Sequence, residues 1–183
     1  SFAWARVTSS FPNQVSDYRM QDQPTTNIRH QSIASSTALN LIAALDAELL
    51  ALYPEDGTDQ HFQLDAEEVS GGQGAFLVAY VAGEAVGGVG IHPGEDIYRH
   101  SAELGYWLGE AHWGRGLVVA ALRVVVPAAM EHFRLHRVHA GVFAGNPASM
   151  RVLERVGFQR DGVLPCAVVK RGELLDVHVY SVV

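Results

Sequence analysis

Apolar residues in the first half of the chain recur in patterns typical of a strand followed by a helix. The segment NIRHQSI at residues 27–33 predicts a first strand. A helix is predicted next, because apolar side chains recur at helical spacing and stop before Pro54. These apolar residues are Leu39, Ile42, Leu45, Leu49 and Leu52. Ser35 or Ser36 is suited to cap this helix, since a short hydroxyl side chain can accept from the free amides of the first turn.

The middle of the chain is typical of a hairpin and a further strand. Two apolar runs within residues 74–92 flank the turn sequence Ala82-Gly83-Glu84, which predicts a β-hairpin. The segment SAELGYWLGE at residues 101–110 predicts the next strand. Between the first helix and the hairpin, residues 54–73 predict a loop with a short helical turn.

The second half alternates between helices and strands. A helix is predicted from about Leu117 to Phe133, and Pro127 inside it should cause a kink because proline cannot donate a backbone hydrogen bond. A strand at residues 137–143 follows. Asn146 and Pro147 suit the start of another helix, which ends at a glycine. That glycine is Gly157. Two further strands are predicted at about 163–169 and 173–182, joined at Arg171-Gly172.

The first 25 residues are polar and aperiodic, and they contain a methionine, Met20, that suits a natural start. We therefore predict a poorly ordered or accessory arm at residues 1–25 and one domain at residues 26–183. The chain has 183 residues, 48% of them hydrophobic and 18% charged, which is a globular composition.

Charge and cysteine content narrow the function. The formal net charge of −7 argues against a nonspecific nucleic-acid partner, since no surplus of basic residues exists to neutralise phosphates. The single cysteine, Cys166, excludes an internal disulfide framework and a multi-cysteine zinc site, and the nine histidines have no metal-site spacing. With no apolar run of membrane-spanning length and no signal peptide, we expect a soluble, cytoplasmic protein without a membrane partner. No pattern indicates the oligomeric state.

The stretch HWGRGL at residues 112–117 has a different character, because glycines flank an arginine just before an apolar helix. Bare backbone amides at the start of a helix form an anion site. Gly-x-Gly alone is more typical of an ordinary strand–helix turn. ELGYWL before the loop and Asn-Pro-Ala-Ser after it favour the anion site.

The runs ELGYWLGEAHWGRGL and RVHAGVFAGNPASMRVLERVGF resemble the GNAT superfamily of N-acetyltransferases. They are most similar to its RimJ/RimL-like branch, which acetylates protein N-terminal amines. The resemblance runs from about residue 101 to the C-terminus, whereas the first half matches only the order of elements. It implies an α/β (α+β) fold: a mixed, mostly antiparallel twisted sheet of about six to seven strands, flanked by about four helices. A splayed strand pair in this sheet would hold the cofactor.

The resemblance also implies how acetyl-CoA, the co-substrate, binds without a metal. The family pattern Gln/Arg-x-x-Gly-x-Gly/Ala aligns with WGRGLV at residues 113–118, where Gly116 matches and the first and last positions depart from it. The loop amides would bind the pyrophosphate, with a charged contact from Arg115. The cofactor-binding residues implied are Tyr106, Trp107, Leu108, Trp113, Gly114, Arg115, Gly116, Leu117, Val118, Asn146 and Ser149. Packing and loop shaping are the alternative roles for the three aromatic residues among them.

Proton transfers need a base and an acid. Backbone amides near Trp107 and Leu108 would stabilise the oxyanion. Glu103 is the candidate base, provided that burial raises its proton affinity, and a solvated carboxylate is the alternative interpretation. His139 is a competing base, and His178 is a weaker candidate.

For the acid, many relatives use a tyrosine at the position of Leu153, so that group is absent here. The branch instead has a serine, Ser149, whose hydroxyl would hydrogen-bond the departing sulfur. Asn146 would bind the pantetheine amide and cap the helix, and capping alone is the alternative. Water or Tyr180 is the fallback proton source. Cys166 is predicted to be a small buried residue, which favours direct transfer in a ternary complex over an acetyl-cysteine intermediate.

These features favour an acetyl-CoA-dependent N-acetyltransferase with a protein or peptide α-amine as acceptor. An α-amine has a pKa of about 7.7–8.0, against about 10.4 for lysine, so a modest base suffices. A small amine or an antibiotic is the alternative acceptor, a non-catalytic CoA-binding sensor is the alternative function, and the size of the acyl group stays open. Four carboxylates suit an acidic lip for a cationic substrate or a solvated helix end: Glu48, Glu55, Asp56 and Asp59.

Overall fold

The computed structural model describes residues 16–18, 26–32, 34–52, 74–170 and 172–183. Most of the predicted arm at 1–25 and almost all of the predicted loop at 54–73 lie outside the described residues. The side chains of Leu49 and Leu52, and the predicted acidic lip, also lie outside what is described.

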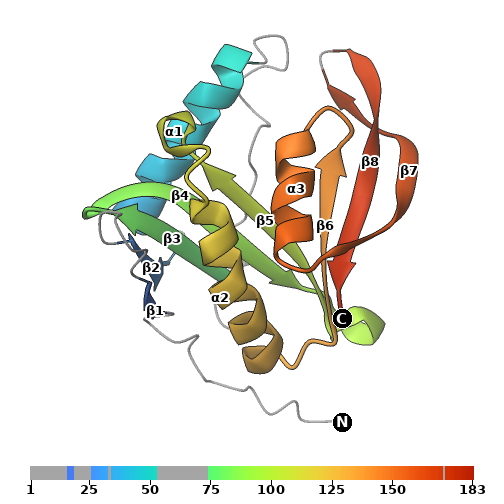
Figure 1. Cartoon of the computed structure of the whole chain (residues 1–183), viewed down its shortest axis with the longest axis horizontal. Helices are drawn as coiled ribbons and strands as arrows, with labels where there is room; N and C mark the ends of the chain where they lie inside the picture. The colour runs from blue at the N-terminus through green and yellow to red at the C-terminus, as the bar shows by residue number, and fades with distance from the viewer. Residues whose placement is uncertain (1–15, 19–25, 33, 53–73, 171) are drawn as a thin grey trace.

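One mixed sheet organises the described chain (Figure 1). Its strands are β1 (Ser16–Tyr18), β2 (Thr26–His30), β3 (Ala75–Val81), β4 (Glu84–Pro93), β5 (Ser101–Leu108), β6 (Arg137–Phe143), β7 (Gln159–Lys170) and β8 (Glu173–Val182). Their spatial order is β1-β2-β3-β4-β5-β6-β8-β7, and only β5 and β6 pair in parallel. The predicted fold class, a mixed and mostly antiparallel sheet with helices on it, is confirmed. The eighth strand is β1, which lies inside the segment predicted to be an arm.

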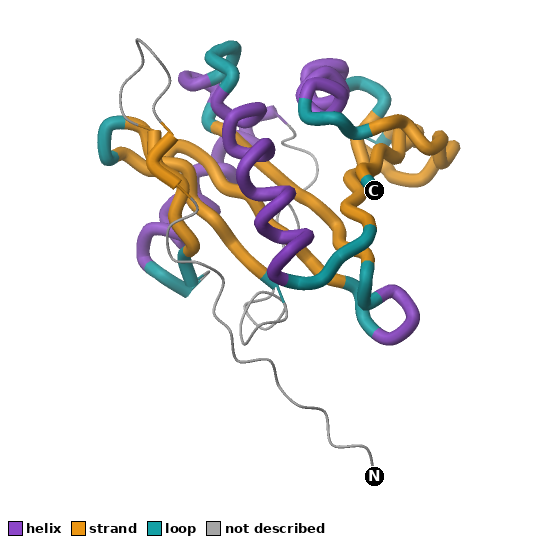
Figure 2. Tube along the Cα trace, turned by 60° about the horizontal axis from the view of Figure 1, so that its bottom comes forward, coloured by secondary structure: helices purple, strands orange, loops and turns teal. Residues whose placement is uncertain are grey.

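Helices cover both faces of this sheet (Figures 1 and 2). The described α-helices are α1 (Ser36–Leu52), α2 (Leu117–His132) and α3 (Pro147–Arg155), with short 3-10 turns η2 (Asp96–Tyr98) and η3 (Glu110–His112). On the α1 face, Ala38 and Leu41 are buried against Phe76 and Val78 of β3. On the other face, α2 and α3 bury a larger cluster together with the alternate residues of the same strands. Alternation along each strand sends successive side chains to opposite faces and so supplies both layers.

The buried stripe of α1 differs from the predicted one. Leu39, predicted to belong to it, is 54% exposed, whereas Ala38, Leu41 and Leu45 are buried. A stripe at 38, 41 and 45 has the same helical spacing, but its first member is a small alanine that packs closely against the sheet.

Local end signals act as predicted. The Ala38 amide donates to Ser35 Oγ at 3.2 Å, so Ser35 rather than Ser36 caps α1. Beyond α3, Gly157 has φ of +95° and the Phe158 amide donates to the Leu153 carbonyl at 3.0 Å, which is a Schellman ending. At Ala82-Gly83 both φ angles are positive, as a two-residue hairpin turn between β3 and β4 requires.

Helix α2 runs through Pro127 as predicted, and the kink expected at this residue stays a prediction. Strand β7 and its cysteine differ from what was predicted. Strand β7 begins four residues earlier than predicted and contains an irregularity between Leu164 and Val168. Cys166 lies in this irregularity with φ of +51° and is exposed, so its predicted burial is wrong. Its amide donates to Asp176 Oδ1 at 2.9 Å, which stabilises a bulge that turns the thiol outward.

The pairing of β5 with β6 positions the site. The two strands pair only over their first three residues, from Ser101 opposite Arg137 to Glu103 opposite His139. Beyond this point β5 stays paired with β4 as far as Leu108, whereas β6 stays paired with β8 as far as Phe143. The predicted splayed pair is therefore present, and the strands separate just after Glu103.

Candidate functional site

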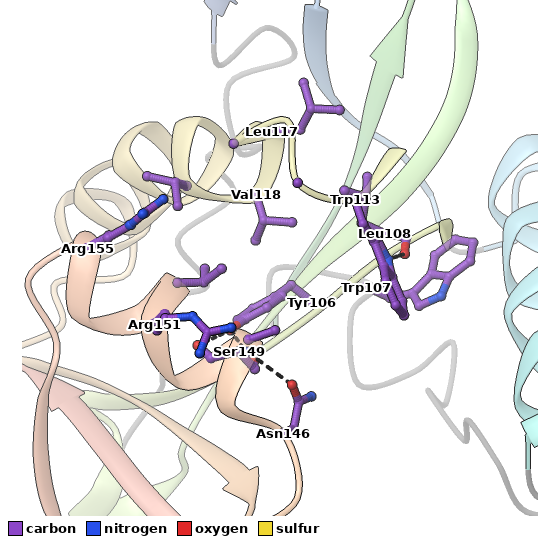
Figure 3. A pocket seen from close by; sticks show the side chains of 15 residues that line it. Tyr106, Trp107, Leu108, Trp113, Leu117, Val118, Asn146, Ser149, Arg151 and Arg155 are labelled. Carbon is purple, nitrogen blue, oxygen red and sulfur yellow. Dashed lines mark hydrogen bonds between the residues drawn. The ribbon is translucent and has the colours of Figure 1, made fainter. Parts of the chain in front are cut away.

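A pocket of about 410 Å³ lies at the far end of β5, between the start of α2 and helix α3 (Figure 3). Every residue predicted to bind the cofactor lines it except Arg115. These lining residues are Tyr106, Trp107, Leu108, Trp113, Gly114, Gly116, Leu117, Val118, Asn146 and Ser149. The volume lies within the usual range for small-molecule sites.

The loop before α2 presents bare backbone to this pocket. Gly114 and Gly116 both have φ of +73°, a conformation that costs other residues steric strain. Trp113 Nε1 donates to the Leu108 carbonyl at 2.6 Å and ties the loop to the end of β5. Gly116 is the N-cap of α2 and has no side chain with which to cap it. The first amides of α2 consequently point out of the helix end with its positive dipole, an arrangement that binds anions.

Cationic side chains reach the pocket from α3, where sequence reasoning did not look for them. Arg151 and Arg155 line the pocket one helical turn apart. Arg115 instead donates to the Ala111 carbonyl at 3.0 Å, so its contact with phosphate stays a prediction. The signal available in the sequence was the four-residue spacing in RVLER, which places both guanidinium groups on one helix face. Arg123 of α2 donates to the Arg155 carbonyl at 3.3 Å and links the two helices.

The first turn of α3 is shaped by its cap. Asn146 Oδ1 accepts from the Ser149 amide at 3.0 Å, and Pro147 occupies the first helical position, so the predicted capping role of Asn146 is confirmed. This contact also sets the position of Ser149 at the pocket wall. Any contact of Asn146 with a ligand stays a prediction.

A tyrosine from β5 meets Ser149 across the pocket (Figure 3). Tyr106 Oη lies 2.5 Å from Ser149 Oγ and 3.2 Å from the Ser149 carbonyl oxygen. Burial raises the pKa of the Tyr106 phenol, and the Ser149 hydrogen bond opposes that shift. The hydroxyl therefore stays protonated at neutral pH. Sequence reasoning gave Tyr106 a packing or cofactor-lining role and did not pair it with Ser149.

The alternative acids lie elsewhere. Leu153, at the position where many relatives carry the tyrosine, is fully buried in the core. Tyr180 Oη donates to Glu154 Oε1 at 3.3 Å and is not among the residues that line the pocket. Burial and the neighbouring Glu154 carboxylate raise the pKa of Tyr180.

The backbone of β5 offers amides to the gap between β5 and β6. The Gly109 amide donates to the Val86 carbonyl, and the Gly94 amide donates to the Ser101 carbonyl. The backbone groups of the odd-numbered residues of β5 therefore bond to β4. Even-numbered residues then direct their backbone groups toward β6, where beyond Glu103 no paired strand remains. The Leu108 amide faces the gap as predicted. The Trp107 amide faces β4, and this correction follows from the register.

Glu103 lies where the two strands separate. Its side chain is exposed and does not line the pocket. The burial on which its role as a base was conditioned is therefore absent, and that role stays a prediction. His92 of β4 and His139 of β6 lie opposite it in register, so one row of titratable side chains crosses the three strands. Because Ala102 and Leu104 are buried on the α2 face, this row lies on the α1 face.

The two histidines predicted as competing bases have separate surroundings. His139 Nδ1 lies 3.4 Å from Ser101 Oγ, and the ring is half-buried. His178 lies opposite Val142 on β8, away from the pocket, and its Nδ1 is buried without a hydrogen-bond partner. Neither residue lines the pocket.

Two further observations concern metals and membranes. Among the residues that the structure describes, no group of three or more His, Cys, Asp or Glu side chains is placed to hold a metal ion. In the same part of the chain, no helix has both the length and the apolar character needed to cross a membrane.

Comparison with known proteins identifies relatives over much of this fold. A family model described as "Acetyltransferase (GNAT) domain" matches residues 39–159. "Probable N-acetyltransferase YjcK" of Bacillus subtilis (strain 168) is 40% identical over 82 residues, which are 45% of this chain and 45% of that protein. "Ribosomal-protein-serine acetyltransferase" of Escherichia coli (strain K12) is 28% identical over 110 residues, 60% of this chain and 61% of that protein.

A solved structure supports the same fold. Mycobacterium smegmatis RimJ in complex with CoA-disulfide aligns with a TM-score of 0.69 and 22% identity, covering 87% of this chain and 82% of that one. At this identity the likeness shows the fold alone. The two sequence matches span 45% and 61% of the lengths of these curated relatives.

Proposed function

Because the chain belongs to the GNAT acetyltransferase family, we propose that it transfers an acetyl group from acetyl-CoA to a primary amine, by direct transfer in a ternary complex. We propose further that the acceptor is a protein or peptide N-terminal α-amine. The observation that carries the proposal is the pocket at the splayed strands, which combines an anion-binding helix start with a hydroxyl pair on its opposite wall.

The residues present fit the phosphate groups of acetyl-CoA. The amides at residues 114–118, the dipole of α2, and the guanidinium groups of Arg151 and Arg155 are all suited to bind negative charge. Gly114 and Gly116 have no Cβ atoms, so the backbone is open where phosphate oxygens would approach. Asn146, at the mouth of α3, is suited to bind the pantetheine arm.

Acetyl-CoA supplies the activated thioester whose acetyl carbon is transferred. The acceptor nitrogen forms a bond to that carbon, the carbon–sulfur bond breaks, and the amine loses one proton while the sulfur gains one. In this proposal the Leu108 amide, which faces the gap between β5 and β6, donates to the developing oxyanion. Ser149 Oγ, at the pocket wall, would donate a hydrogen bond to the departing sulfur, and Glu103 would take the amine proton through water.

Two observations support a peptide α-amine as acceptor. The Escherichia coli relative carries a name that specifies a ribosomal-protein acceptor. The net charge of −7 suits a basic partner. The side chain of Glu103 is exposed to water. A carboxylate base suffices more readily for an α-amine than for a lysine, given their reference pKa values of about 7.7–8.0 and 10.4.

An acetyl-transfer assay against a panel of amines tests this function, with mass spectrometry to locate the added group. The panel contains N-terminal peptides of ribosomal proteins, the same peptides with blocked N-termini, free amino acids, polyamines and aminoglycosides. We expect acetylation of unblocked peptides at the α-amine. Faster transfer to a small amine than to any peptide would show that the acceptor is a small amine and not a peptide. Binding of acetyl-CoA without transfer to any amine would identify a non-catalytic CoA-binding sensor.

A further inference from the structure

Two hydroxyl groups from different walls of the pocket lie in direct contact. Tyr106 comes from β5 and Ser149 from the first turn of α3, and their oxygens are 2.5 Å apart. Tyr106 packs against the main core, and the backbone amide of Ser149 is bonded to Asn146, so the tyrosine ring and the serine backbone are held in place. This contact joins the two walls where the splayed strands open.

One hydrogen atom lies between the two oxygens, and either Tyr106 or Ser149 can be its donor. In one arrangement Tyr106 donates to Ser149 Oγ, and the serine hydrogen is free to point into the pocket. In the other, Ser149 donates to Tyr106 Oη, and Tyr106 donates its own hydrogen to the Ser149 carbonyl 3.2 Å away. Only the first arrangement lets Ser149 act as a donor toward a ligand.

We propose that Tyr106 is a positioning residue that donates its hydrogen bond to Ser149 Oγ and so directs the serine hydroxyl at the sulfur of the bound thioester. This inference rests on the proposed acetyl transfer and deepens it. As negative charge grows on the sulfur, a chain running from Tyr106 through Ser149 to the sulfur becomes stronger at each bond. A neutral thioester sulfur is a weak acceptor, so the contact favours the transition state over the bound substrate.

No net proton loss from Tyr106 is required. The departing thiolate accepts a hydrogen bond from Ser149, and Ser149 and Tyr106 both keep their protons. The sulfur takes its proton from water after the carbon–sulfur bond has broken. Burial of the phenol supports this order, since it disfavours the tyrosinate. The tyrosine therefore acts through Ser149 and does not touch the reacting atoms.

A double-mutant cycle tests the coupling, with kcat and KM for acetyl-CoA measured on wild type, Tyr106→Phe, Ser149→Ala and the double variant. Phenylalanine keeps the ring and its packing. We expect Tyr106→Phe to lower kcat about ten-fold with KM within about two-fold, and the double variant to be no slower than Ser149→Ala. Tyr80→Phe is the matched control, because Tyr80 Oη also loses a side-chain hydrogen bond, to Gln31, outside the pocket.

A second measurement follows the thiol itself. Ultraviolet difference absorbance of CoA bound to the protein gives the pKa of its thiol, which is near 8.5 for an ordinary thiol. We expect wild-type protein to lower that pKa, and both Tyr106→Phe and Ser149→Ala to return it toward the free value. A role limited to tethering α3 to β5 would change the melting temperature without changing this pKa.

The outcomes separate the two proposals. If the wild-type protein acetylates no amine, the proposed function fails. If wild type turns over and Tyr106→Phe leaves kcat and the thiol pKa unchanged, or if the two substitutions act additively, the positioning role of Tyr106 is overturned.

Discussion

Replacing Gly116 by alanine separates the cost of a strained backbone from the cost of a crowded pocket. Gly116 has φ of +73° and ψ of 9° and is the N-cap of α2. A Cβ added there meets no heavy atom within 4 Å, so the folded protein without ligand loses stability through the left-handed conformation alone. That conformation costs an L-residue about 1–2 kcal/mol. For a chain of this size each kcal/mol lowers Tm by about 2–4 °C, so Tm should fall by about 2–8 °C.

Ligand binding adds a second, larger signature. Acetyl-CoA at about 100 times its Kd stabilises wild-type protein by about 2.7 kcal/mol, which corresponds to a rise of about 5–11 °C. In the Gly116→Ala variant the methyl group occupies the space that a phosphate oxygen needs next to the amides. A ten-fold weaker Kd at the same ligand concentration leaves about 1.4 kcal/mol, and the rise in Tm falls to about half. Gly116→Val should lose nearly all of it, because the side chain is larger and β-branched.

The matched control is Gly83→Ala, assayed by the same thermal-shift titration. Gly83 has φ of +88° and open space at its Cβ, but it lies in the turn between β3 and β4 and does not line the pocket. We expect it to lower Tm without ligand by a similar amount and to keep the full rise with acetyl-CoA. The reasoning is refuted if Gly116→Ala keeps the full rise, or if Gly83→Ala loses it equally.

Other substitutions test the remaining parts of the site. Ser149→Ala should lower kcat about 100-fold while KM for acetyl-CoA changes little, and near-normal turnover would make the serine structural. Glu103→Gln should lose most activity at low pH, where the acceptor amine is protonated, so a pH–rate profile parallel to wild type would remove Glu103 as the base. Arg151→Gln and Arg155→Gln should each raise KM for acetyl-CoA about three- to ten-fold, with a weaker effect in high salt; unchanged KM would exclude phosphate contacts. Arg137 of β6 donates a hydrogen bond to the carboxylate of Asp161 in β7 and lowers the pKa of that carboxyl. The stabilisation from this contact is therefore present above the unfolded pKa and is lost as pH falls through the folded pKa. Asp161→Asn should therefore lower Tm slightly at neutral pH and not in acid, and an equal loss at both pH values would contradict this assignment.

Much of the fold follows from signals that act over a few residues. The cap at Ser35, the cap at Asn146 and the helix ending at Gly157 each depend on one side chain or one positive φ angle near a helix end. Helical and strand periodicities act over a single element. These features were predictable because the backbone conformations involved are determined by neighbours in the chain. The glycine loop before α2 belongs to the same group, whereas most of the pocket lining was implied by the resemblance to the GNAT superfamily.

The chemistry within the pocket depends on contacts between distant parts of the chain. Tyr106 and Ser149 are 43 positions apart, and only the packing of α3 beside β5 brings their hydroxyls together. The rotation of α3 likewise decides that Arg151 and Arg155 face the pocket, whereas Arg115 in the predicted loop bonds to its own backbone.

Strand register decided the remaining differences. The alternation of β5 against β4 turns the Leu108 amide toward the gap and the Trp107 amide away from it, and it leaves Glu103 exposed on the other face. A bulge in β7 exposes Cys166 where an unbroken strand pattern predicted burial. Local sequence therefore determined which elements form and where they end. Only the tertiary structure decided which side chains and amides meet, because register and helix rotation are set by packing over the whole sheet.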